Sequence, residues 1–159
     1  MNPLDSQIVE WVKKLGLNAT VQPTTGQEAF RVSISPPTGF PVVDVIRPSK
    51  EADFYIVIMG IAVAQQHQDA LRGLSPEQRA DFLLDLQMEL TKFEVDMAFI
   101  PPGVDVPQAI QVSRVLFTDD LNVTSFFNTY YKVRNAGLYV LFAFNKKFKV
   151  PVPGGRTYM

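Results

Sequence analysis

The sequence predicts an α+β protein in which a mainly antiparallel sheet is covered by helices. Short runs that alternate apolar and polar residues between turn residues predict strands, and runs with apolar residues at helical spacing predict helices. The strands come in consecutive groups instead of alternating with helices, which favours α+β over α/β. The predicted order is helix, three strands, helix, two strands and a long C-terminal helix.

The first predicted element is a helix that ends near Gly16. Its apolar residues recur at helical spacing, and Asp5 or Ser6 is the expected N-cap. Gly16 is a suitable stop because the residue just beyond a helix often needs a positive φ.

Three strands follow, at residues 30–34, 42–46 and 54–61. The third is apolar at nearly every position, which predicts a central strand covered on most of both sides. Residues 20–22 are a candidate for an additional edge strand.

The middle of the chain carries the clearest local signal. After a short predicted helix at residues 63–71, Ser75 and Gln78 form a capping box with Pro76 at the first helical position. The helix that begins there leads to two strands, at residues 95–100 and 109–117.

The last predicted helix spans residues 121–147, with Asp119 or Asp120 as its expected cap. Residues 138–144 could instead form a strand, but they lack alternation and end in an Asn-Lys-Lys sequence typical of a helix end. We expect one domain over residues 1–149 and a flexible tail over residues 150–159.

Composition narrows the class of protein. The chain has 159 residues, 47% of them hydrophobic and 19% charged, as in globular proteins. Because it has no cysteine, disulfides, thiolate nucleophiles and cysteine-bound metal centres are excluded, and a cytoplasmic location is expected. The longest apolar runs are too short to span a membrane, and a net charge of −1 gives no general nucleic-acid footprint.

The charges are divided by position along the chain. Residues 1–120 contain all sixteen acidic residues and nine basic ones, a net charge of −7, whereas residues 121–159 contain six basic residues and a net charge of +6. The basic segment is also rich in phenylalanine and tyrosine. This pattern predicts a segment that docks on the acidic body or on a partner.

The residues also resemble a known family. Segments 67–71, 74–79, 82–86 and 109–114 are similar to an uncharacterised, mostly archaeal family of unknown function. The order of elements resembles the type III secretion chaperone-like fold, a small α+β scaffold that usually forms homodimers and binds other proteins. The resemblance implies that fold and a dimer, but no activity.

Two sets of residues are candidates for chemistry. His67 is the sole histidine, and a metal or hydrolytic site built on it would need Asp69, Asp81 or Asp85 as partners. The simpler interpretation of His67 is a solvated residue on a short helix. Asp81, Asp85 and Glu89 lie one helical turn apart, and paired carboxylates can do acid–base work or hold magnesium. Charges at this spacing are also typical of a solvent face, and they would suit contact with the basic last helix, within one chain or between two.

The last helix is the candidate for self-association. Three roles are open for its aromatic run. The run could pack in the core, form an interface, or belong to an element that binds anionic surfaces through Lys146, Lys147 and Lys149. The expected interface anchors are Phe127, Tyr131, Leu138 and Phe142.

The sequence as a whole favours a non-enzymatic, soluble, protein-binding or chaperone-like adaptor that acts as a homodimer. No cofactor, catalytic residue or nucleic-acid partner is expected. The alternatives are a small metal-dependent hydrolase that uses His67, and an anionic-surface binder that uses the basic C-terminal segment.

Overall fold

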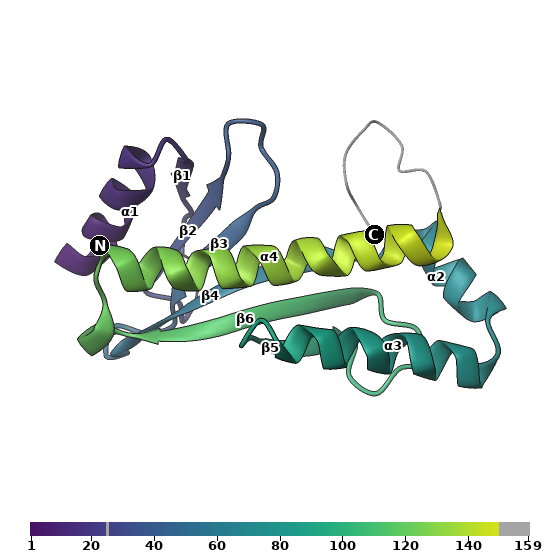
Figure 1. The fold of residues 1–159 in the computed structure, drawn as a ribbon. Coiled ribbons are helices and arrows are strands. Elements are labelled where there is room, and N and C mark those ends of the chain that lie inside the picture. The colour runs from purple at the N-terminus through teal and green to yellow at the C-terminus, as the bar shows by residue number, and fades with distance from the viewer. Residues whose placement is uncertain (25, 150–159) are drawn as a thin grey trace. The chain divides into compact units, whose positions relative to one another are not determined.

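The structure, a computed structural model, describes residues 1–24 and 26–149 (Figure 1). It confirms the predicted α+β class and the order of helices and strands. The elements are α1 (Pro3–Lys14), β1 (Asn18–Val21), β2 (Phe30–Ser35), β3 (Val43–Arg47), β4 (Phe54–Ala62), α2 (Gln65–Gly73), α3 (Pro76–Thr91), β5 (Asp96–Ile100), β6 (Ala109–Phe117), the 3-10 turn η1 (Thr118–Asp120) and α4 (Val123–Phe148). The tail expected at residues 150–159 lies outside the described residues.

The six strands form an antiparallel sheet in the order β1-β2-β3-β4-β6-β5. In its first half, Val32 lies opposite Val45, which lies opposite Val57. The candidate edge strand at residues 20–22 is present as β1, which begins two residues earlier and ends one residue earlier, and it pairs with β2.

The chain divides into two compact units. Unit 1 comprises residues 1–59 and 113–134, and unit 2 comprises residues 60–112 and 135–159. Each unit is described separately below. That residues 1–149 fold as one domain stays a prediction.

The core of unit 1 is built from strand residues that alternate toward the buried face. In β4, Tyr55 and Val57 are fully buried, whereas Phe54, Ile56 and Ile58 are only half-buried. The strand is central, between β3 and β6, as the sequence predicted, but its second face is covered less completely than expected. Its apolar residues on the second face are partly open to solvent. The other buried apolar residues of unit 1 are Ile8, Val9, Val12, Phe30, Val32, Ile34, Val43, Val45, Ile46, Met59, Leu116, Phe126, Tyr130 and Val133.

The predicted caps are partly wrong in unit 1. The N-cap of α1 is Asn2, whose side chain accepts a hydrogen bond of 2.8 Å from the Asp5 backbone N–H, while the Asp5 carboxylate accepts one of 2.8 Å from the Asn2 backbone N–H. Asp5 is thus the third helical residue, and not the cap. Gly16 has φ of 82°, as its role as helix stop requires.

The start of α4 also differs from the prediction. Asp119 and Asp120 lie in η1, and Asn122 takes the capping role instead. Its side chain accepts a hydrogen bond of 2.9 Å from the Ser125 backbone N–H, and the Ser125 hydroxyl accepts one of 2.9 Å from the Asn122 N–H. From there α4 runs as one helix of 26 residues, which excludes a strand at residues 138–144.

In unit 2, α3 packs against β5, and its buried residues recur at the helical spacing seen in the sequence. The capping box is confirmed, since the Gln78 N–H donates to Ser75 Oγ at 3.1 Å and the Ser75 N–H donates to Gln78 Oε1 at 3.2 Å. The buried apolar residues of this unit are Ile61, Val63, Leu71, Leu83, Leu86, Leu90, Ile110, Val112, Ala136, Val140, Leu141 and Phe144.

Candidate functional site

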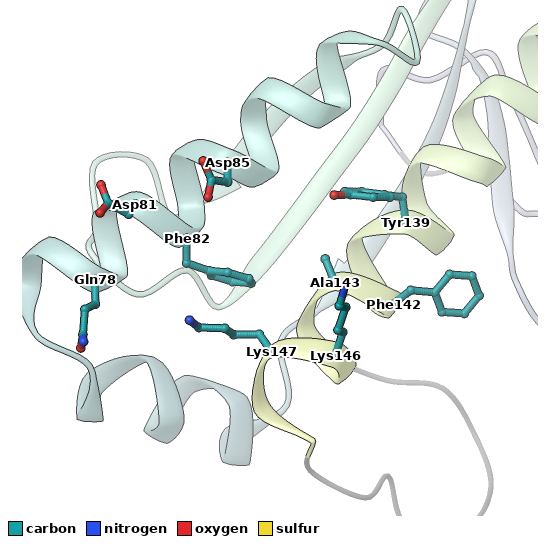
Figure 2. Close-up of a pocket in the computed structure, with 9 residues that line it drawn as sticks. All are labelled: Gln78, Asp81, Phe82, Asp85, Tyr139, Phe142, Ala143, Lys146 and Lys147. Carbon is teal, nitrogen blue, oxygen red and sulfur yellow. The ribbon is translucent and has the colours of Figure 1, made fainter.

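An open groove of about 690 Å³ lies between α3 and α4 in unit 2 (Figure 2). Its size is within the range of ligand and peptide sites in proteins. Both helices contribute side chains of differing chemistry. The lining residues are Gln78, Asp81, Phe82, Asp85, Tyr139, Phe142, Ala143, Lys146 and Lys147.

The α3 wall is acidic. Helical periodicity places Leu83, Leu86 and Leu90 in the core, so Asp81 and Asp85, one turn apart, are left exposed on the groove side. The sequence pattern that predicted an acidic solvent face therefore also identified one wall of the groove.

The α4 wall is basic. Lys146 and Lys147 lie in the last turn of α4, where positive charge is favoured by the helix dipole, and both are exposed. Across the described part of the chain, neither lysine nor Asp81 nor Asp85 takes part in an ion pair. The predicted meeting of acidic and basic helices thus occurs within unit 2 as two facing walls, but without direct pairing.

The groove is apolar between these walls. Phe82 extends from α3 toward α4, and Lys147 extends from α4 toward α3 (Figure 2). Phe82 makes edge contacts with Phe144 and Phe148, with ring centroids 5.1 and 5.5 Å apart. Phe142 extends from the rim away from α3, and 59% of its surface is exposed (Figure 2).

The four predicted interface anchors lie in different settings. Phe127 and Tyr131 belong to unit 1, where both are half-buried and their rings are 6.3 Å apart. Leu138 and Phe142 belong to unit 2, and Leu138 is half-buried. Phe142 is the most exposed of the four and the one that lines the groove. That any of them forms an interface stays a prediction.

His67 does not lie where the sequence predicted. Instead of being solvated, it is buried with 1% of its surface exposed, and its ring packs against Phe144 and Phe148 of α4. Burial lowers the pKa of His67 below its ordinary value of 6.5. The physical reason for the error is tertiary, because a short helix with one polar face gives no sign that its histidine will be covered by distant aromatic residues.

The described residues give the hydrolase hypothesis no support. Asp69, the nearest proposed partner of His67 in sequence, bonds instead with Gln65 at 2.9 Å and with Arg72 at 3.1 Å. Within residues 1–24 and 26–149, no three histidine, cysteine or acidic side chains are grouped so as to hold a metal ion.

Unit 1 contains a buried polar network that the sequence did not reveal. Arg47 Nη2 donates to Asp5 Oδ2 at 2.6 Å, Arg47 Nε donates to Asp5 Oδ1 at 3.0 Å, and the Tyr55 hydroxyl donates to the same Oδ1 at 2.6 Å. Asp5 and Tyr55 are 0% exposed and Arg47 is 5% exposed. The network joins α1 to β3 and β4 and is structural, since every member has a partner.

The members of this network determine one another's protonation state. Burial by itself raises the pKa of Asp5, but hydrogen bonds from Arg47, Tyr55 and the Asn2 backbone outweigh it, so the pKa of Asp5 lies below its usual value of 3.8. Burial and the Asp5 carboxylate raise the pKa of the Tyr55 hydroxyl, which stays protonated. Asp5 is therefore a carboxylate and Tyr55 a neutral donor throughout the neutral pH range.

Unit 1 also has an apolar strip on the second face of its strands. A hydrogen bond of 2.8 Å from the Thr118 N–H to the Asp53 carbonyl ties the end of β6 to the start of β4 in this unit, and the rings of Phe54 and Phe117 meet 6.1 Å apart. Phe117 is 53% exposed. The other apolar residues of the strip are Ile56, Ile58 and Val115.

No helix within the described residues combines the length and the apolar character that crossing a membrane requires. What the fold and the groove define is an α+β protein with an open site of mixed charge between two helices. The chain belongs to the family of uncharacterized conserved proteins designated DUF2299, which matches residues 4–144.

One solved structure supports the fold. The crystal structure of an uncharacterized protein from Methanothermobacter thermautotrophicus is 24% identical, covers 91% of this chain and 98% of its own, and superposes with a TM-score of 0.82. No curated protein matches the sequence. The expected membership of an uncharacterised family is thus confirmed, and the likeness to type III secretion chaperones stays a prediction.

Proposed function

We propose that this protein is a non-enzymatic, soluble, cytoplasmic binding module that acts as a homodimer, in the manner of a chaperone-like adaptor. One observation carries the proposal. The groove of unit 2 presents acidic residues on one wall and basic residues on the other, none of them in an ion pair with another described residue, beside the exposed ring of Phe142.

A surface with both signs of charge suits a second copy of itself. In a twofold dimer the same patch faces itself, so each contact between two residues occurs twice with the roles exchanged. Asp81 and Asp85 of one copy then face Lys146 and Lys147 of the other, and the reverse pair forms across the axis. No like charges need to meet.

Apolar burial supplies most of the stability of such a dimer. Exposed ion pairs contribute only about 0.2–1 kcal/mol each, whereas buried apolar surface contributes roughly 25 cal/mol per Å². In unit 2, Phe142 is 59%, Met88 59% and Leu84 53% exposed. Covering these side chains drives association, and the charged walls fix its register.

The decisive experiment exchanges the charges of one wall at a time. Asp81→Lys/Asp85→Lys makes the whole patch positive, and Lys146→Glu/Lys147→Glu makes it negative. Light scattering on a sizing column should show each variant alone near the monomer mass of 17.8 kDa. An equimolar mixture should restore a species of about twice that mass.

The mixture distinguishes contacts between chains from contacts within one. If the two walls interact only within a chain, mixing restores nothing. If the wild-type chain is itself monomeric at low and at high salt, the dimer proposal is wrong.

Phe142→Asp is the single substitution with the largest expected effect on the dimer. It places a charge on an exposed apolar residue of the proposed interface and should reduce the measured mass toward 17.8 kDa at micromolar concentration. The matched control is Val123→Asp, which changes another apolar residue of α4 that is 46% exposed but lies in unit 1. A folded Phe142→Asp variant that remains a dimer would remove Phe142 from the interface.

The adaptor part of the proposal needs a second surface for a client protein. The apolar strip of unit 1, with Phe54 and Phe117 at one end, has the partial exposure and aromatic content typical of such surfaces. The order of elements resembles that of a type III secretion chaperone-like scaffold, and this resemblance is the basis for proposing an apolar segment of another protein as the client.

A further inference from the structure

The buried histidine of unit 2 has no hydrogen-bond partner among the residues that the structure describes. His67 is 1% exposed, and neither Nδ1 nor Nε2 bonds to any described group. Its ring centroid lies 5.7 Å from that of Phe144 and 5.8 Å from that of Phe148. Phe82 of α3 contacts the same two phenylalanines, so the four rings form one cluster that joins α2, α3 and the end of α4.

This environment tolerates a neutral imidazole much better than a charged one. A neutral ring already forgoes a donor and an acceptor when it is buried without partners. An imidazolium would bring an unpaired charge into an apolar cluster, which is far more costly. Consistent with this, burial lowers the pKa of His67.

The charged groups of the three helices offer no compensation. None of them bonds to the His67 ring, and the groups on α4, which packs directly on the ring, are positive. Asn145 Oδ1 on α4 is a neutral acceptor that is also buried without a partner. The charged residues on these elements are Asp69 and Arg72 of α2, Glu77, Arg79, Asp81, Asp85 and Glu89 of α3, and Lys132, Arg134, Lys146 and Lys147 of α4.

We infer that His67 is a proton-sensitive lock, so that protonation of its ring loosens the aromatic cluster that holds α2, α3 and the last turns of α4 together. The inference concerns the packing of unit 2 alone, and it holds whether or not the chain forms a dimer. Acidification would release the end of α4 and the Phe82 wall of the groove.

The direction of the pH effect follows from linkage. The unfolded chain binds a proton on His67 near pH 6.5, whereas the folded chain resists it to lower pH. The unfolded state therefore binds more protons just below pH 6.5, and stability falls as the pH falls through that region.

The first test is direct, because the chain contains one histidine and its ring signals in NMR spectra need no assignment. A titration of the native protein should give a midpoint below the ordinary value of about 6.5. A midpoint at or above that value would overturn the inference.

The second test compares the wild type with His67→Gln and with the double variant Gln66→His/His67→Gln. Gln66 is exposed on the same helix, so the double variant keeps one histidine but moves it into solvent. Between pH 7.5 and 5.5 the melting temperature of the wild type should fall by about 2–4 °C more than that of either variant.

Hydrogen exchange locates the effect. At pH 5.5, after correction for intrinsic rates, protection should decrease in the peptides of α2 and the end of α4 in the wild type only, with residues 30–59 as the internal control. Equal pH profiles in all three proteins would show that His67 is an inert core residue, and so would a wild-type loss of protection confined to unit 1.

Discussion

The two units bury polar side chains in opposite ways. Unit 1 buries Asp5, Arg47 and Tyr55 as one network in which the carboxylate accepts three side-chain hydrogen bonds. Unit 2 buries His67 among phenylalanine rings with no hydrogen bond to either nitrogen. At a similar degree of burial, the side chain with partners is stable in its charged form and the side chain without partners is stable in its neutral form.

The difference teaches how partners decide the meaning of a buried ionisable group. A complete network makes the ionised form the stable one, and removing a single member exposes the full desolvation penalty of the others. A group without partners is stable only while neutral, so its environment is sensitive to protons. The following predictions test this contrast, beginning with the largest expected effect.

Asp5→Ala should be the most damaging single change. It leaves the Arg47 guanidinium buried without its counter-charge and Tyr55 without its acceptor. We expect the free energy of unfolding, measured in urea, to fall by about 3–5 kcal/mol. Asp5→Leu/Arg47→Met is the control, since removing both charges should restore part of the loss. A small effect of Asp5→Ala would mean that water reaches the network.

As the pH is lowered, the two units should lose stability one after the other. Unit 2 should lose stability first, as the pH falls below 6.5, the ordinary pKa that His67 has in the unfolded chain, because the folded chain binds this proton less readily. Unit 1 should hold until the pH falls below 3.8, the ordinary pKa of Asp5, because the folded-state pKa is lower and the stabilising carboxylate is lost only there. An acid titration followed by one probe in each unit should therefore show two separate transitions.

The reporters for this experiment are built into the chain. Trp11, the sole tryptophan, packs against Phe126 at a centroid distance of 6.1 Å and reports on unit 1 by fluorescence. The His67 ring signals report on unit 2. Coincident transitions of the two probes would contradict separate behaviour of the units.

Ser75→Ala should have the smallest of these effects. It removes the side-chain acceptor for the Gln78 backbone N–H at the start of α3. A loss of about 1 kcal/mol is expected from the thermal unfolding curve. Ser75→Asp, which keeps an acceptor, should retain most of the stability. A loss several times larger would show that the start of α3 also stabilises the groove and its aromatic cluster.

Predictions from the sequence were most often correct for features that depend on residues close together in the chain. The Ser75 cap, the Gly16 stop and the continuous last helix are encoded within one or two helical turns, and all three are present. The wrong caps were also local, but there neighbouring residues competed. Asn2 caps α1 instead of Asp5, and Asn122 caps α4 instead of Asp119 or Asp120. The asparagine side chains accept hydrogen bonds from the backbone N–H groups of Asp5 and Ser125.

The groove was partly predictable. Its acidic wall and its basic wall both stood out as charge patterns, and Phe142 stood out as an apolar residue in excess of what a core needs. Phe82 and Tyr139, which fill the space between the walls, carried no signal, since aromatic residues at helical spacing are equally typical of a core.

The sequence by itself determined the α+β class, the order of elements, the division of charge and the absence of cysteine chemistry, because periodicity, capping and composition act over short distances. Only the tertiary structure decided the environment of each ionisable group. Asp5 meets residues 42 and 50 positions away, and His67 meets rings more than seventy positions away. Which of them would be paired and which left alone depends on how distant segments pack, and local sequence carries no record of that.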